Sequence, residues 1–174
     1  AMSLLHAINA DQSVSESVPA RAARDSTEAK LLALLGRPDE AKVMVDAAVD
    51  RMCKAVGAGS HDCQRMTLGG IDTLLLSGNL SEARTRLDRI LPALSEQPSL
   101  QISANGFSMA LALRETPNES TLQNVLDTMP EIAKAGKLPR RNVVRALLLL
   151  AEYLQVRHHD AYAKRLAIKA IEVA

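Results

Sequence analysis

One short motif recurs along this chain at a nearly constant interval. The segment 36–41 reads GRPDEA and the segment 78–83 reads GNLSEA, each after a leucine-rich stretch and before an amphipathic one. Two fainter copies follow at nearly the same interval, and the equivalent anchor positions are Ala41, Ala83, Leu122 and Ala163. A period of about 40 residues is typical of repeat proteins, in which each unit buries its apolar face only against its neighbours.

Within each repeat, apolar residues recur with the spacing of an amphipathic helix. Leu87, Ile90, Leu91 and Leu94 follow the i, i+3, i+4, i+7 pattern, and no stretch alternates as a strand would. Hydrophobic residues make up 47% of the chain but aromatic residues only 2%, a composition that favours helix over sheet. We predict helices near residues 20–35, 38–56, 62–77, 80–95, 99–114, 120–135, 139–156 and 160–174.

Several residues mark where these helices begin. A proline costs nothing in a first helical turn, where its missing N–H would have no partner, and three are placed there: Pro19, Pro38 and Pro139. Asn79, with Glu82 three residues later, resembles a capping box. Asp160 is expected to cap the last helix.

The chain divides into a leader and one repeat domain. We expect residues 1–19 to hold the remnant of a preceding helix, near 2–8, and a loop over 10–18. Residues 20–174 are expected to form about four helical hairpins. The last residues stop within a helical pattern, which predicts that the chain was excised from a longer protein.

The charge balance limits the kinds of partner. The chain has 21 basic and 20 acidic residues, and a net charge of +1 supplies no field that would recruit nucleic acid or an anionic membrane. No apolar run approaches the roughly 20 residues of a membrane span. One basic cluster stands out, and we interpret it as a solvated loop, with phosphate or acidic-peptide binding as the alternative: Lys134, Lys137, Arg140, Arg141 and Arg145.

The repeats resemble those of the tetratricopeptide repeat family. The family's small first-helix residue is matched by Ala29, Ala110 and Ala151, its inner-turn glycine by Gly36 and Gly78, and its second-helix alanine by Ala41, Ala83 and Ala163. Two positions depart from the pattern, because Ile71 and Leu122 stand where the family has small residues. The repeat length is similar to that of the long-helix variant found in bacterial regulatory kinases and transcription regulators.

This resemblance implies an all-α solenoid, a right-handed superhelix of stacked antiparallel hairpins whose concave groove is lined by first-helix residues. Carried onto this chain, the groove residues expected to bind a partner are Arg65, Asp72, Leu76, Phe107, Leu111, Arg114, Arg145, Leu148 and Glu152. The competing interpretation is that Phe107, Leu111 and Leu148 fill the core or meet a neighbouring repeat.

The two cysteines, Cys53 and Cys63, flank the first loop between repeats. A disulfide would clip this loop in an oxidising compartment. Two reduced thiols in a cytoplasmic protein are the alternative, and we expect a cytoplasmic location, or a periplasmic one if the cysteines are bridged. A zinc site with His61 would lack a fourth ligand.

No motif for catalysis is present. The sequence has no nucleophile elbow and no phosphate-binding glycine loop, since Gly69 and Gly70 lie within a helical pattern. The pair His158 and His159 reads as a polar turn rather than a metal site. We therefore expect a non-catalytic module without cofactors.

The expected function is protein–protein interaction within a larger, bacterial regulatory protein, in which the concave groove binds a peptide or a partner helix. The alternative is a domain that senses a small ligand or signal peptide and controls an attached kinase or DNA-binding domain. Self-association through exposed repeat ends is a third interpretation.

Overall fold

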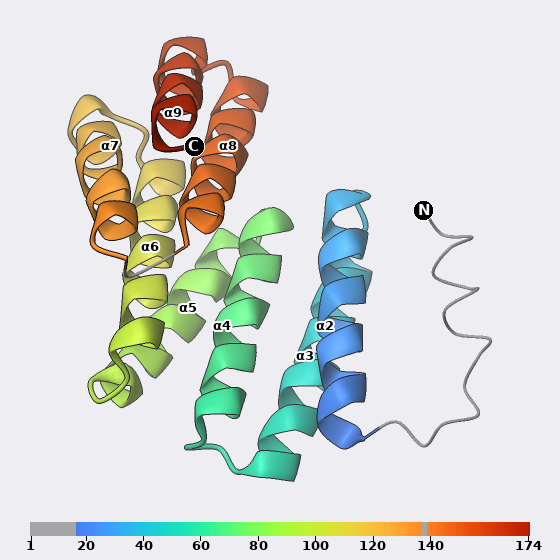
Figure 1. Ribbon diagram of the computed structural model, residues 1–174. Helices are drawn as coiled ribbons and strands as arrows, with labels where there is room; N and C mark the ends of the chain where they lie inside the picture. Colours follow the sequence, from blue (N-terminus) through green and yellow to red (C-terminus); the bar gives the residue numbers. More distant parts are fainter. Residues whose placement is uncertain (1–16, 137–138) are drawn as a thin grey trace.

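The computed structural model describes residues 17–136 and 139–174, and every regular element in these ranges is a helix (Figure 1). The all-α prediction is confirmed for this part of the chain. The expected helix remnant near residues 2–8 lies outside the described residues, as does most of the expected loop. The helices are α2 (Val18–Leu34), α3 (Pro38–Val56), α4 (His61–Leu76), α5 (Leu80–Ile90), η1 (Leu91–Leu94), α6 (Pro98–Glu115), α7 (Glu119–Lys134), α8 (Arg140–Val156) and α9 (Asp160–Val173).

The predicted helix boundaries agree with these bounds to within a few residues, except over 80–95. There the α-helix ends at Ile90 and a 3₁₀ turn, η1, continues to Leu94. Pro92 explains the change, because a proline has no N–H to donate and its ring clashes with the carbonyl one turn earlier. Asn105 and Gly106, by contrast, lie inside α6 without interrupting it.

The helices pack in chain order. Each odd-numbered helix contacts the even-numbered one before it, as α2 with α3 and α8 with α9. The even-numbered helices also contact one another in succession, α2 with α4, α4 with α6, and α6 with α8. In Figure 1 the chain progresses from α2 and α3 on the right, through α4 in the centre and α5 and α6 to its left, to α7, α8 and α9 in the upper part.

The turns within three helix pairs share one backbone geometry. Gly36, Gly78 and His158 have φ angles of 73°, 76° and 61°, in the left-handed region. In each turn the N–H of the next residue donates to a carbonyl five residues earlier, as from Asn79 to Leu74 at 2.9 Å and from His159 to Leu154 at 2.9 Å. This is the helix-ending pattern that glycine favours, and it makes the turn at His158 equivalent to the two glycine turns.

The same turns show why two predicted caps are wrong. A capping side chain needs extended backbone at its own residue, as in Ser17, Ser60 and Asn118, whose ψ angles are 150°, 151° and 170° and whose side chains do accept from the helix. Asn79 has a ψ of 61° and caps nothing. His159, not Asp160, occupies the cap position of α9, with a ψ of 51° and no capping bond.

The prolines follow the prediction in two of three places. Pro19 and Pro38 lie in the first turns of α2 and α3. Pro139 instead precedes α8 as its N-cap residue. The α6–α7 connection is the exception among the turns within pairs, because it ends in a true capping box between Asn118 and Thr121.

The four anchor positions found in the sequence are all buried. Ala41, Ala83 and Leu122 have no exposed surface, and Ala163 is 7% exposed. At Gly70 the backbone of α4 lies close to α3, since a Cβ at this position would lie 3.3 Å from a side-chain carbon of Val49. Small residues at these helix contacts allow the backbones to approach, so larger side chains there would overpack the core.

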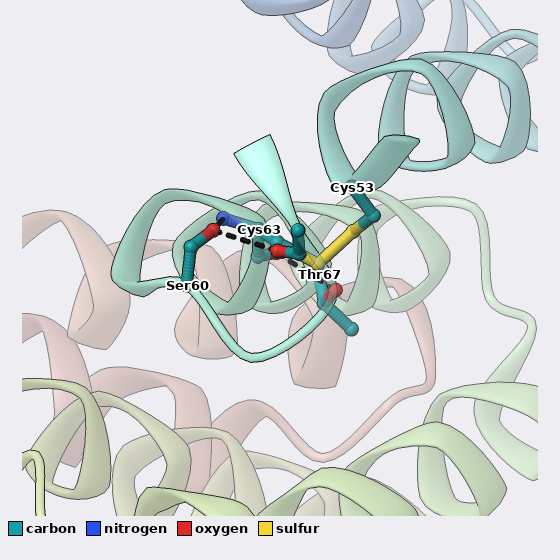
Figure 2. Close-up of a disulfide and its surroundings, with 5 residues drawn as sticks. Cys53, Ser60, Cys63 and Thr67 are labelled. Carbon is teal, nitrogen blue, oxygen red and sulfur yellow. Dashed lines mark hydrogen bonds between the residues drawn. A yellow bond between two sulfur atoms is a disulfide. The ribbon is translucent and has the colours of Figure 1, made fainter. Parts of the chain in front are cut away.

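A disulfide between Cys53 and Cys63 joins the end of α3 to the start of α4, with 4.7 Å between the Cα atoms (Figure 2). Ser60 closes the loop between them: its hydroxyl donates to the Gly57 carbonyl at 2.8 Å and accepts from the Cys63 N–H at 3.2 Å. In this structure the two sulfurs are bonded to each other, which is the bridged alternative rather than the pair of reduced thiols or the zinc site.

Candidate functional site

A pocket of about 290 Å³ lies where α4, α6 and α8 meet. Helix α2 contributes Lys30 to its wall, and α7 contributes Val125 and Met129. The remaining lining residues are Asp72, Leu75, Leu76, Ser103, Gly106, Phe107, Met109, Ala110, Arg114, Asn142, Arg145, Ala146, Leu149 and Leu150. Consecutive first helices of the repeats therefore supply most of the surface.

Several predicted groove residues come together here. Those that line the pocket are Asp72 and Leu76 from α4, Phe107 and Arg114 from α6, and Arg145 from α8. They belong to three different repeats, and the succession of α4, α6 and α8 brings them to one place.

The other predicted residues lie elsewhere. Leu111 has no exposed surface and packs in the core with Ala104 and Leu87, so its assignment to the partner surface is corrected to a core position. Arg65 lies exposed near the start of α4, where it pairs with Asp62 at 3.3 Å. Leu148 and Glu152 line a neighbouring hollow on α8, beside Arg145 and Ala174.

Three charged residues of the pocket lie on consecutive even-numbered helices, and two of them, Lys30 and Asp72, occupy equivalent repeat positions, directly after Ala29 and Ile71. Lys30, Asp72 and Arg114 follow one another at equal intervals in the sequence, and they lie on α2, α4 and α6. Lys30 and Asp72 form an ion pair of 2.7 Å, in which both side chains are about a quarter exposed. A cation, an anion and a second cation thus follow one another across the first helices.

The guanidinium of Arg114 has an unusual environment. One of its terminal nitrogens donates to the Leu75 carbonyl, and its central carbon lies 4.4 Å from the centre of the Tyr153 ring. Its Nε is buried and has no hydrogen-bond partner in the part of the chain that the structure describes. Burial lowers the pKa of Arg114, and the nearby Tyr153 and Asp72 oppose this shift. The ring face and the carbonyl both attract this cation. They offset the cost of burying its charge only in part, because no carboxylate contacts it.

The charge of the pocket is unbalanced. Its described lining residues include the cations Lys30, Arg114 and Arg145, but only one anion, Asp72. Asp72 is already paired with Lys30, and among the described residues neither Arg114 nor Arg145 forms an ion pair. The pocket therefore combines an apolar wall with two guanidinium groups that no described carboxylate contacts.

Sequence reasoning missed Lys30, Asn142 and Leu149. A signal for Lys30 was present, because Lys30 follows Ala29 just as Asp72 follows the equivalent Ile71. Leu149 has no such signal, because the position equivalent to Phe107 in the next repeat is Leu148. No periodic signal indicates Asn142.

The described residues contain neither a cluster of metal-ligating side chains nor a helix suited to crossing a membrane. Nowhere in residues 17–136 and 139–174 do three or more His, Cys, Asp or Glu side chains gather closely enough to hold a metal ion. No helix in the same ranges has both the length and the hydropathy that a membrane span requires.

Comparison with known proteins gives no relative: no family model, no curated protein and no solved structure matches this chain.

Proposed function

We propose that this chain is a non-catalytic protein-interaction module that binds a peptide or a partner helix in the pocket between α4, α6 and α8. The observation that supports this proposal most directly is that one partly apolar pocket is lined by Asp72, Phe107 and Arg145, which lie on three separate helices. Charged groups around an apolar anchor site set the register of a bound segment, while the apolar contacts supply most of the affinity.

The proposed architecture is a solenoid of the tetratricopeptide type. The succession of contacts from α2 to α4, α6 and α8 supports it, because stacked hairpins place their first helices side by side. The equivalent turns at Gly36, Gly78 and His158 support it as well. In such an array the first helices line the inner surface, and the same helices supply most of this pocket.

A larger regulatory protein, of the bacterial kind that the resemblance indicates, is the proposed context. The Cys53–Cys63 disulfide supports an oxidising compartment such as the periplasm, since cytoplasmic thiols are kept reduced. Trapping free thiols with an alkylating agent in intact source cells, followed by mass spectrometry, distinguishes the two locations. An unmodified, bridged pair supports the oxidising compartment, and alkylated cysteines contradict it.

The binding proposal is tested by affinity capture from a lysate of the source cells with the whole chain as bait. Arg145→Glu reverses a charge in the pocket, and Arg89→Glu makes the same reversal on the exposed face of α5 as a matched control. A discrete protein that is captured by the wild type and by Arg89→Glu, but lost with Arg145→Glu, is the expected result. Equal capture by all three baits would place the interface elsewhere.

A small-molecule sensor is the second candidate. The volume of the pocket, about 290 Å³, is close to the lower limit for small-ligand sites. A ligand that shifts the curvature of the array would then regulate the attached domain. Screening of metabolites by thermal shift tests this candidate, and a rise in the melting temperature that Arg145→Glu abolishes would favour it.

A further inference from the structure

We infer that the pocket between α4, α6 and α8 selects an acidic side chain of the partner that lies next to a bulky apolar side chain. This inference rests on the proposed interaction function and names the chemistry of the segment that binds. It depends on three features of the pocket, which are its two guanidinium groups without a carboxylate, its apolar wall and its volume.

The net positive charge of the described lining residues favours a ligand that carries a negative charge. The only carboxylate among its described lining residues, Asp72, is held by Lys30 at 2.7 Å. Asp72 acts on Arg114 only from a distance, and neither Arg114 nor Arg145 forms an ion pair with a described residue. Arg114 is half-buried, its Nε has no hydrogen-bond partner among the described residues, and Arg145 is exposed on α8. A carboxylate that enters the pocket can bind the accessible Arg145 and lies in the field of Arg114. Hydrogen bonds between guanidinium and carboxylate are the strong, charge-assisted kind.

The apolar wall of the pocket favours a ligand that also carries an apolar group close to its negative charge. Phe107, the single phenylalanine of the chain, is half-buried there, and Leu76 and Leu149 face the same pocket. Met109 and Met129 also line it, and methionine side chains adapt to ligands of different shape. A carboxylate alone would leave this apolar surface in contact with water.

The volume limits the occupant to a small group. The pocket volume of about 290 Å³ is smaller than that of most sites for drug-sized molecules. One or two side chains of a partner therefore fit the pocket better than a larger ligand. The preferred segment is therefore an acidic residue adjacent to a leucine or a residue of similar size.

The test uses blocked dipeptides, whose ends carry no charge. N-acetyl-Leu-Glu-amide is titrated into the whole chain at millimolar concentration, and N-acetyl-Leu-Gln-amide is the matched neutral probe. The methyl signals of the methionines are followed by NMR, because Met109 and Met129 line the pocket whereas Met52 and Met66 pack between α2, α3 and α4. We expect the Glu probe to shift the Met109 and Met129 signals and to bind about ten-fold more tightly than the Gln probe.

Variants separate the pocket from general surface charge. Arg145→Gln is expected to remove most of the preference for the Glu probe. Arg141→Gln, one turn earlier on the same helix but outside this pocket, is expected to retain it. Both residues are exposed, so both variants should keep the wild-type melting temperature, which is measured first.

Three outcomes overturn the inference. Equal binding of the Glu and Gln probes removes the role of the carboxylate, and shifts confined to Met52 and Met66 remove the pocket. Binding of 4-phenylbutanoate without binding of the Glu probe assigns the pocket to a free organic acid rather than to a partner protein. Because none of these measurements uses a cellular partner, failure here is distinguishable from failure of the interaction function, which the affinity capture tests separately.

Discussion

Lys30 and Asp72 lie one repeat apart in the sequence, at equivalent positions, and their side chains form an ion pair of 2.7 Å between α2 and α4. Arg114 follows at the same interval on α6, but it does not extend the chain of ion pairs. It donates instead to the Leu75 carbonyl and stacks on Tyr153. The equivalent residues Lys30 and Asp72 therefore pair with each other in the pocket wall, whereas Arg114 lines the same pocket without an ion pair among the described residues.

The Lys30–Asp72 pair is expected to couple the first two repeats. In a double-mutant cycle with Lys30→Met and Asp72→Asn, we predict a coupling free energy of about 0.5–1 kcal/mol, since both side chains are partly shielded from water. Urea denaturation of the four proteins measures it. A coupling of zero would show that the pair contributes nothing to stability.

Replacement of His158 by glycine is expected to stabilise the protein. His158 has a φ of 61°, which costs energy for any residue with a Cβ, while the two equivalent turn positions already hold Gly36 and Gly78. We predict that His158→Gly raises the free energy of unfolding by about 0.5–1 kcal/mol and that Gly78→Ala lowers it by about 1 kcal/mol. Thermal melting of both variants tests the equivalence of the turns. A lower melting temperature for His158→Gly would contradict it.

Reduction of the disulfide is expected to destabilise the chain without unfolding it. The bridge between Cys53 and Cys63 closes a short loop, and its loss should cost about 2–3 kcal/mol. Denaturant titrations with and without dithiothreitol measure the difference. The variant with both cysteines changed to serine is the control, and it should unfold at the same denaturant concentration under both conditions. An equal midpoint for reduced and oxidised wild type would refute the prediction.

Acid is expected to weaken the contact between α3 and α5. Burial alone would raise the pKa of Asp46, but hydrogen bonds from Arg86 at 2.5 Å and Lys42 at 2.9 Å outweigh it and hold the pKa below its ordinary value. A carboxyl with a lowered pKa in the folded state contributes stability above its unfolded pKa and loses it as the pH falls through the folded value.

The free energy of unfolding of the wild type should therefore fall below about pH 5, and it should fall less steeply in Asp46→Asn. Asp88→Asn, which removes an exposed carboxylate of α5, is the control and should keep the wild-type slope. Urea titrations across the acid range up to neutral pH measure the slopes. Identical slopes for Asp46→Asn and the wild type would exclude Asp46 from the acid response.

The helices were predictable because their signals are local. Apolar spacing, first-turn prolines and turn glycines depend on neighbouring residues only, so the predicted bounds of α3 and α8 agree with the structure almost to the residue. The cap at Asn79 failed for a related reason. A capping side chain also depends on the backbone angle of its residue, and the short link after Gly78 imposes a ψ of 61°.

The candidate site was predictable only in part. Helical periodicity indicates that Leu111 and Arg114, three residues apart, share one side of α6. It does not indicate which of them the neighbouring helices cover. The structure buries Leu111 completely and leaves Arg114 partly accessible in the pocket. The repeat interval would have added Lys30, but the convergence of Arg145 and Arg114 on one pocket depends on how α8 packs against α6, which no local pattern records.

The most direct test of the account is site-specific photo-crosslinking in the source cells. A photoreactive phenylalanine analogue in place of Phe107 probes the pocket, and the same analogue in place of Val43, which is 71% exposed on α3, probes a surface away from it. We expect a discrete protein to be crosslinked from position 107 and not from position 43. Crosslinking of a partner from position 43 with none from position 107 would contradict it.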